Sequence, residues 1–510
     1  MKKILSYIAC AFAAVCVVTS CDLDAIVYSD MTETNYPQNA ADAQSLLDGM
    51  YGYLKTNSGS VNMSSTANTG WGWPVWSIGN IGWYGWQMVT SDEGRSGGAS
   101  NQYTDFTWGT SGDWLQTFQI IKNVTRMTYI LDVIDKTEGI PAAKKSEMIA
   151  EAKCLRGMFM YVVYDLFGPF HVTLDPSEIN DIEYVPRPSK EEYRSWMIKD
   201  FDDAIADLPG KTNHTAQWGR LNKGFASMML AKIHMREHEY AQAVPYLESL
   251  LNMGYSIDPD YFAPFAEEEN DENIYCIPSG VKADNEFYFY TTPGNCAAFL
   301  NVNKEHSHDG QGTFNTTKYW GGFKIQWAFY DTFDDKDIRK GGMAESIRTI
   351  DGNIYTRENP GSTNLQYGAM CCKYFYPQDR AYAGNIHSVC FRYADVLMSL
   401  AECYSMIAGK PTEKALEYIK IITDRAGTTD LTPAAVSTDL EAFKTFLLAE
   451  RGREFYVEGW RRDDLLRFDD YIASALRRGK ASASEKNKLM PIPQRVINES
   501  NGIIEQNPGY

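Results

Sequence analysis

The sequence predicts a mainly α-helical fold, in which tetratricopeptide-like helix pairs form a scaffold that carries long loop-rich inserts. Three observations support this prediction. Apolar residues recur with a spacing near 3.6 towards both ends of the chain. Two segments repeat one helix–turn–helix plan, and two regions, 56–112 and 259–363, are rich in Gly, Asn, Ser, Thr and aromatic residues. Long loops on a rigid scaffold are usually functional, so we expect function to lie in these inserts.

Four helices are expected in the first 210 residues, over 40–54, 114–135, 142–167 and 190–208. Each segment carries an apolar stripe at helical spacing. Gly139-Ile140-Pro141 separates the second helix from the third, because glycine and proline both disfavour a continuing helix. The stripe of the second helix consists of Ile120, Val124, Met127, Ile130, Leu131 and Ile134.

The repeated plan occupies residues 219–254 and 392–427. Leu230-Ala231 in the first unit corresponds to Leu400-Ala401 in the second. Each unit is about 36 residues long, close to the 34 residues of a tetratricopeptide repeat, in which small residues let paired helices approach and stack. The alternative is a pair of unrelated helical hairpins.

The composition is that of a globular, acidic chain. It has 510 residues, 44% of them apolar, which is enough for one large core or two ordinary ones. The formal net charge is −18, and it becomes −20 when residues 1–20, which contain Lys2 and Lys3 but no acidic residue, are removed. Such a chain repels phosphate backbones, so we expect no nucleic-acid partner.

The first residues have the pattern of a signal peptide. Lys2 and Lys3 precede an apolar stretch of about 15 residues, shorter than the roughly 20 that a transmembrane helix requires. Thr19 and Ser20 then lead to Cys21, a context that resembles a bacterial lipobox. The resemblance implies that Cys21 is lipidated and anchors the mature chain to a membrane. The alternative is an ordinary secretory signal that is followed by a cysteine by chance.

The spacing of the remaining cysteines argues against a metal site, and the lack of known catalytic motifs argues against an enzyme. After removal of the signal and the anchor, seven cysteines remain without a C-x-x-C pair, so we interpret them as packing thiols. The sequence contains no G-x-S-x-G, H-E-x-x-H or Walker motif. We therefore expect no cofactor, no metal and no catalytic residues. A glycosidase that uses Asp92-Glu93 as its acid is the third-ranked alternative.

Charged residues between 450 and 467 follow three- and four-residue spacings, which place opposite charges side by side on a helix. We interpret them as an ion-pair network between helices. The alternative makes Glu454 and Glu458 a catalytic acid and base, but carboxylates flanked by several arginines should stay ionised and paired.

Further on, Pro491 and Pro493 predict an extended tether over 490–494 that packs on the helices.

The aromatic loops are the expected binding elements. Residues 70–86 read GWGWPVWSIGNIGWYGW, with five tryptophans interleaved with glycine. Five buried indoles would need five hydrogen-bond acceptors, so we expect these rings to be exposed and to cover the apolar face of a sugar. The alternative is a buried aromatic cluster. The predicted ligand-binding residues are Trp71, Trp73, Trp76, Trp83, Tyr84 and Trp86 with Asn80, Asp92 and Arg95 as polar rim, and Tyr319 and Trp320 from the later insert.

The C-terminal motifs resemble those of the SusD/RagB family. They are 392–402 (RYADVLMSLAE), 450–465 (ERGREFYVEGWRRDDL), 490–494 (MPIPQ) and 506–510 (QNPGY), and 151–156 (EAKCLR) also fits. With the lipobox, the resemblance runs from residue 21 to residue 510. It divides the chain into a signal peptide, 1–20, an N-terminal segment, 21–215, that holds the early aromatic loop, and a C-terminal segment, 216–510, that holds the later insert.

This resemblance implies a cell-surface lipoprotein of Bacteroidetes on the outer membrane. It implies capture of oligosaccharide and its delivery to a TonB-dependent barrel of the SusC type. In the family, a glycan site generally combines an aromatic residue of the early loop with one of the later insert. Trp320 best matches the later residue, whereas the early one cannot be assigned uniquely. Capture of peptides for the same kind of transporter is the leading alternative.

Overall fold

The computed structural model describes twelve stretches of the chain. They are residues 37–54, 83–96, 102–111, 118–181, 183–267, 269–277, 311–314, 323–349, 353–361, 363–371, 373–374 and 387–510. Seven of the predicted functional residues lie outside the described residues: Cys21, Trp71, Trp73, Trp76, Asn80, Tyr319 and Trp320.

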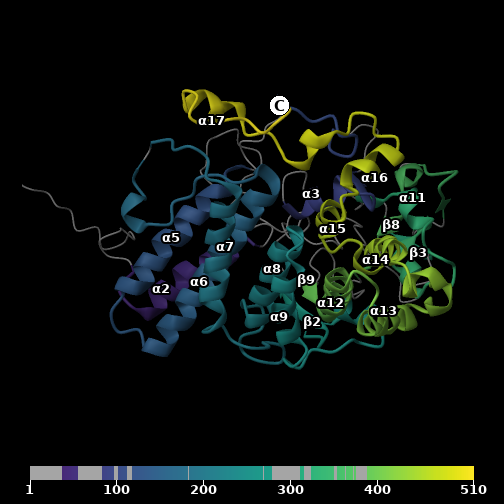
Figure 1. Ribbon diagram of the computed structural model, residues 1–510, viewed down its shortest axis with the longest axis horizontal. Coiled ribbons are helices and arrows are strands. Elements are labelled where there is room, and N and C mark those ends of the chain that lie inside the picture. The colour runs from purple at the N-terminus through teal and green to yellow at the C-terminus, as the bar shows by residue number, and fades with distance from the viewer. Residues whose placement is uncertain are drawn as a thin grey trace, which may run out of the picture.

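The scaffold is a series of helices in which sequence neighbours pack on one another (Figure 1). Polar side chains cap several of them; for example, Ser189 accepts a hydrogen bond from the Glu192 backbone N–H at the start of α7. The four helices predicted in the first 210 residues are present. The scaffold helices are α2 (Ala40–Tyr51), α5 (Ile121–Lys136), α6 (Ala142–Phe167), α7 (Lys190–Ile205), α8 (Lys223–Arg236), α9 (Tyr240–Leu250), α12 (Tyr393–Ala408) and α13 (Glu413–Ala426).

The two predicted repeat units form helix pairs, α8 with α9 and α12 with α13. They also stack, because α9 packs against α12 although an insert of more than 100 residues separates them in the sequence. Gly409 and Gly427 end α12 and α13 with φ of 65° and 75°, a left-handed conformation that glycine adopts without strain. The prediction of a mainly helical scaffold with stacked pairs is confirmed.

Further helices complete the C-terminal part. The tether predicted over 490–494 is extended over 490–493: Met490 and Ile492 are buried, and the Met490 N–H donates to the Leu166 carbonyl at 2.6 Å. Its last residue, Gln494, already begins a helix. These elements are α14 (Leu440–Phe455), α15 (Arg461–Arg467), α16 (Tyr471–Arg477) and α17 (Gln494–Glu499), with the 3₁₀ turns η7 (Thr429–Leu431), η8 (Ala434–Ser437) and η9 (Glu485–Lys488).

The described parts of the inserts, and the segments next to the helices, contain short strands and short helices. β1 (Gly94–Ser96) pairs with β4 (Phe323–Ile325), and β2 (Asn273–Ile277) pairs with β9 (Ser388–Arg392), both antiparallel. The further elements are α3 (Trp83–Val89), η1 (Pro176–Glu178), α10 (Ala263–Ala266), β3 (Gln311–Phe314), α11 (Trp327–Tyr330), η5 (Ile338–Gly342), β5 (Met343–Ala344), β6 (Ser346–Thr349), β7 (Ile354–Tyr355), η6 (Leu365–Tyr367) and β8 (Met370–Cys371).

Five cysteines fall in the described ranges, and all are buried free thiols, as predicted for packing residues: Cys154, Cys276, Cys371, Cys390 and Cys403. Among the described residues, no helix combines the length and apolar character needed to span a bilayer. Nor do the described stretches bring three or more His, Cys, Asp or Glu side chains together in a metal-binding arrangement.

Candidate functional site

The last four residues of the predicted aromatic loop, 83–86, are not exposed. Trp83, Tyr84 and Trp86 lie on α3, and each ring is only 1% exposed. The Trp83 indole N–H donates to the Asp165 carboxylate at 2.7 Å, and the Tyr84 hydroxyl donates to the Val457 carbonyl at 2.5 Å. Our expectation that these three rings face water is therefore wrong. They form part of the core instead.

The physical reason is that α3 packs against α15 and finds acceptors for its polar atoms in the Asp165 carboxylate on α6 and the Val457 carbonyl. Asp165 on α6 receives hydrogen bonds from Trp83, from Gln87 at 2.7 Å and from two arginines, Arg236 and Arg462, at 2.8 and 2.7 Å. Burial alone would raise the pKa of Asp165, but these two guanidinium groups hold it well below its usual range. A charged acceptor of this kind makes a buried indole favourable.

Directly after α3, the chain joins the later insert through the β1–β4 pair. Arg95 pairs with Lys324 in this ladder. Gln326 secures the join: its backbone N–H donates to the Glu93 carbonyl at 2.9 Å, and its side-chain amide donates to the carbonyls of Ser91 and Gly94 at 3.1 and 2.8 Å. We call β1, β4 and Gln326 the loop junction. It brings residues 94–96 of the early loop region against the later insert.

A second contact extends the loop junction towards β8. Ile325 and Ala369 exchange two backbone hydrogen bonds of 3.0 and 2.8 Å. Gly368 makes this approach possible, because a Cβ atom there would lie 2.0 Å from the Ile325 carbonyl oxygen. The Arg95 guanidinium lies 4.5 Å from the ring centroid of Tyr367 in a cation–π contact. Sequence reasoning missed Gln326 and Tyr367, since nothing in the local sequence marks either residue as part of a site.

Asp92, a predicted rim residue, forms a two-point ion pair with Arg461 at 2.7 and 2.8 Å. Burial raises the pKa of this carboxyl, but Arg461 more than offsets the effect and lowers it. Its neighbour Glu93 is fully buried, and burial together with the Asp92 charge raises the pKa of Glu93 to about 8. Asp92 is therefore held ionised by Arg461 and Glu93 is fully buried, so neither is the exposed, protonated acid that the glycosidase alternative requires.

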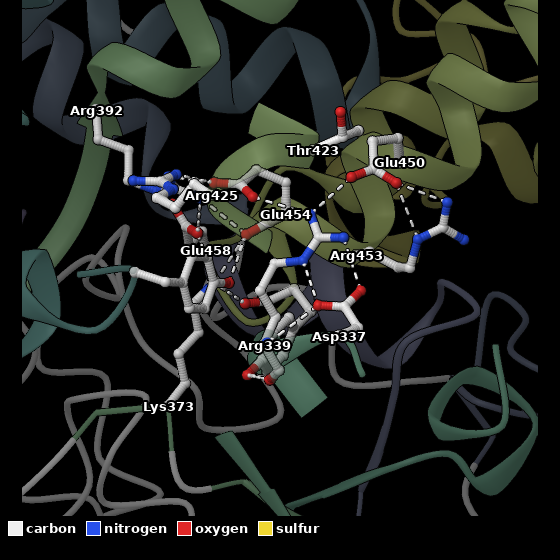
Figure 2. A network of polar contacts seen from close by, with 12 residues as sticks. Asp337, Arg339, Lys373, Arg392, Thr423, Arg425, Glu450, Arg453, Glu454 and Glu458 are labelled. Atoms are coloured by element: carbon white, nitrogen blue, oxygen red, sulfur yellow. Dashed lines mark hydrogen bonds and ion pairs between the residues drawn. The ribbon is translucent and has the colours of Figure 1, made fainter. Parts of the chain in front are cut away.

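The charged C-terminal motif forms the predicted ion-pair network, which Figure 2 shows from close by. Arg392 is completely buried and binds Glu272, Glu454 and Glu458 at 2.6–2.9 Å. Burial alone would raise the pKa of Glu454, but Arg425, Arg392 and Arg339 hold it well below its usual range. Glu454 and Glu458 are thus paired and shielded from solvent, which excludes the acid–base alternative for them.

The same network includes Lys373, which follows β8 by two residues. Lys373 donates to the Glu458 carboxylate at 2.6 Å and to the backbone carbonyls of Glu454 and Tyr456. Further pairs link the helices: Arg451 with Asp395 and Asp464, Arg467 with Glu402, Asp463 and Asp464, and Arg339 with Asp337 and Glu450. The network fixes α14, α15 and β9 relative to one another.

Comparison with known proteins agrees with this architecture. Residues 349–510 match the model of the SusD family. The chain is 24% identical to the starch-binding protein SusD of Bacteroides thetaiotaomicron over 482 residues, which cover 80% of this chain and 81% of that protein. It is 22% identical to the SusD-like protein P25 of Formosa agariphila over 394 residues, or 70% of each chain.

A solved structure shows the same fold. It is the surface glycan-binding protein A of Bacteroides thetaiotaomicron, in complex with laminarihexaose, which superposes with a TM-score of 0.69 at 17% identity. The superposition covers 92% of this chain and 100% of that one. The stacked helix pairs, the buried ion-pair network of the C-terminal motif and these comparisons agree: residues 349–510 match the SusD family, and the mainly helical fold of the chain is SusD-like.

Proposed function

We propose that this protein is a surface lipoprotein that captures an oligosaccharide and delivers it to a TonB-dependent, SusC-like transporter in the outer membrane. Proteins of the family are binding proteins without catalytic activity. The observation that carries the proposal is the loop junction, because it joins the early aromatic region to the later insert that contains Trp320. One relative is named for starch binding, and one similar structure contains laminarihexaose.

The binding surface that we propose combines aromatic residues from both sides of the loop junction. Trp320 lies three residues before the start of β4 in the sequence. Three residues of extended chain span at most about 10 Å. Since Trp83, Tyr84 and Trp86 are buried, the early aromatic partner comes from Trp71, Trp73 and Trp76. Stacking on a sugar adds about 0.5–1.5 kcal/mol per aromatic ring beyond the area that it buries. Tyr319, Asn80 and the partly exposed edges of Asp92 and Arg95 complete the proposed rim.

A binding assay with the mature protein tests this proposal. The affinity of the wild-type protein for starch, laminarin and other neutral polysaccharides is compared with the affinities of the Trp320→Ala and Trp76→Ala variants. Trp196→Ala serves as the control, because it removes an indole from α7, outside the proposed binding surface. We expect Trp320→Ala to weaken binding about tenfold or more, which corresponds to about 1.4 kcal/mol. Unchanged affinity in both loop variants would refute the proposed site. Binding of peptides but of no glycan would favour the peptide alternative.

The anchor and the transporter have their own test. We propose that lipid on Cys21 holds the protein on the outer face of the outer membrane. The Cys21→Ala variant should be absent from the membrane fraction. Protease added to intact cells should digest the wild-type protein. Purification of the wild-type protein from detergent-solubilised membranes should recover a TonB-dependent barrel. Retention of Cys21→Ala in the membrane would refute lipid anchoring.

A further inference from the structure

A small pocket of about 170 Å³ lies where both loop regions leave the helical scaffold, apart from the loop junction. Leu54 and Ile277 line it, and in the sequence they lead into the early aromatic region and into residues 278–310 of the later insert. His387, which precedes β9, packs its ring against a third lining residue, Trp218, with the ring centroids 5.7 Å apart. We call this cavity the stem pocket. A cavity of about 150 Å³ accepts one six-membered ring, so the stem pocket has room for one ring only.

A tight turn before α8 places an aromatic ring and a guanidinium in the lining of the stem pocket. The backbone N–H of Trp218 donates to the Thr215 carbonyl at 3.1 Å, and that of Arg220 donates to the Gln217 carbonyl at 2.9 Å. Between them, Gly219 has a φ of 81°, a left-handed conformation that glycine adopts without strain. The Trp218 side chain is only partly buried, so its indole ring forms a flat apolar wall.

The guanidinium of Arg220 is held in a fixed orientation. Its Nε and Nη2 donate to the Glu151 carboxylate on α6 at 2.6–3.1 Å, and Nη2 also donates to Asp48 on α2 at 2.9 Å. The group lies 5.2 Å from the ring centroid of Tyr51 in a cation–π contact. Nη1 makes no hydrogen bond within the described residues and stays accessible to solvent, so it remains available as a donor.

Asp48 supplies an acceptor beside this donor. Its Oδ1 accepts from Arg220 and from Gln44, the latter at 2.8 Å, whereas its Oδ2 accepts no hydrogen bond from the described part of the chain. The Asp48 side chain is 48% exposed, so a ligand can approach it. Arg220 is shared by the carboxylates of Asp48 and Glu151, which leaves one net negative charge on the group and disfavours anionic ligands.

We propose that the stem pocket binds a single neutral pyranose ring, as a second sugar site separate from the surface at the loop junction. Two neighbouring hydroxyls of a sugar can donate to Asp48 Oδ2 and accept from Arg220 Nη1, because a hydroxyl does both. The apolar face of the ring can then pack on the Trp218 indole. The proposal rests on the proposed function, since a captured oligosaccharide supplies the ring, and a pocket for one ring selects the end of such a chain.

Saturation-transfer difference NMR titrations with glucose test the proposal, and glucuronate serves as the charged probe. The parent protein is the mature Trp76→Ala/Trp320→Ala variant, which lacks two indoles of the surface proposed at the loop junction. The variants made in this parent are Asp48→Ala, Trp218→Ala and Trp218→Phe. Asp424→Ala is the matched control, because its carboxylate is as exposed as that of Asp48 (49% and 48% of the side chain) and also pairs with a basic residue.

We expect glucose to bind the parent with a Kd of about 1–10 mM, and glucuronate to bind at least about fivefold more weakly. Asp48→Ala and Trp218→Ala should each weaken glucose binding about fivefold or more, whereas Asp424→Ala should bind like the parent. Trp218→Phe keeps an aromatic ring and should retain most of the affinity. Circular dichroism checks that each variant is folded, and Asp48→Ala decides the outcome if Trp218→Ala is not.

Three results would each overturn the proposal. They are the absence of saturable glucose binding to the parent, equal effects of Asp48→Ala and Asp424→Ala, and binding of glucuronate as tight as that of glucose. The proposed function is judged separately, by the polysaccharide affinities of the wild type and of Trp320→Ala. Loss of one site in these assays therefore leaves the other open to measurement.

Discussion

Replacement of Glu454 by glutamine should destabilise the fold severely, although it changes only a few atoms. Three arginines bind this carboxylate: Arg425 at 2.5 Å and Arg392 at 2.6 Å on one oxygen, and Arg339 at 3.0 Å on the other. The variant amide retains a single acceptor, and its NH₂ group faces a guanidinium that can only donate. It also leaves three buried cations with one negative charge fewer.

The size of the effect follows from the burial of the network. Removing one partner from a buried ion pair costs about 3–5 kcal/mol, because the remaining charges stay desolvated. At about 2.1 cal/mol/K per residue, the entropy of unfolding of a 510-residue chain is about 1 kcal/mol/K. Glu454→Gln should therefore lower Tm by about 3–5 °C, which differential scanning calorimetry at neutral pH and low salt can measure.

Glu499→Gln is the control for this measurement. Glu499 pairs with Arg495 on the exposed surface of α17, where solvent screens the charges, so its replacement should leave Tm unchanged within error. If Glu454→Gln and Glu499→Gln shift Tm equally, the network does not stabilise the fold in the way that its burial implies. The reasoning about the C-terminal motif would then be refuted.

Three further substitutions test other parts of the structure. Gly368→Ala places a Cβ against the Ile325 carbonyl and should weaken both stability, by about 1–3 kcal/mol, and glycan binding, whereas Gly210→Ala, with open space around it, should change neither in the same assays. Glu93 stays protonated in the fold up to about pH 8 but ionises near pH 4.5 when unfolded, so the wild type loses stability as pH rises between these values. Glu93→Gln does not titrate, and in urea its stability relative to the wild type should therefore rise from about pH 5 to about pH 8; a constant difference would refute the assignment. Trp83→Ala removes a buried indole and should cost about 3–5 kcal/mol in urea unfolding, and a cost near zero would contradict its place in the core.

The helical scaffold could be predicted from the sequence because its signal is local. The apolar stripes of α5 and α6 repeat every three to four residues, and Gly139-Ile140-Pro141 marks the break between them. The ion-pair network could also be predicted in kind, since opposite charges at three- and four-residue spacing occur within one helix. Its long-range members, such as Glu272 and Lys373, carry no local signal of their own.

The candidate site could be predicted only in part. The tryptophan-rich run gives no sign that Trp83 is buried, because the acceptor that lets this indole be buried, Asp165, lies 82 residues further along the chain. β1 and β4 have three residues each, too few for an alternating pattern, and their pairing depends on Gln326. Such contacts follow from the tertiary structure and not from propensity.

The loop junction also bears on how related binders can diverge. It fixes residues 94–96 of the early region to residues 323–325 of the later insert with backbone hydrogen bonds, which do not depend on the side chains of the neighbouring segments. The segments that adjoin β1 and β4 can therefore change in length and composition while the two strands stay paired. The same helical scaffold can in this way present new surfaces without changes in its core. A protein that lacks either β1 or β4 would lose the pairing that joins the two regions.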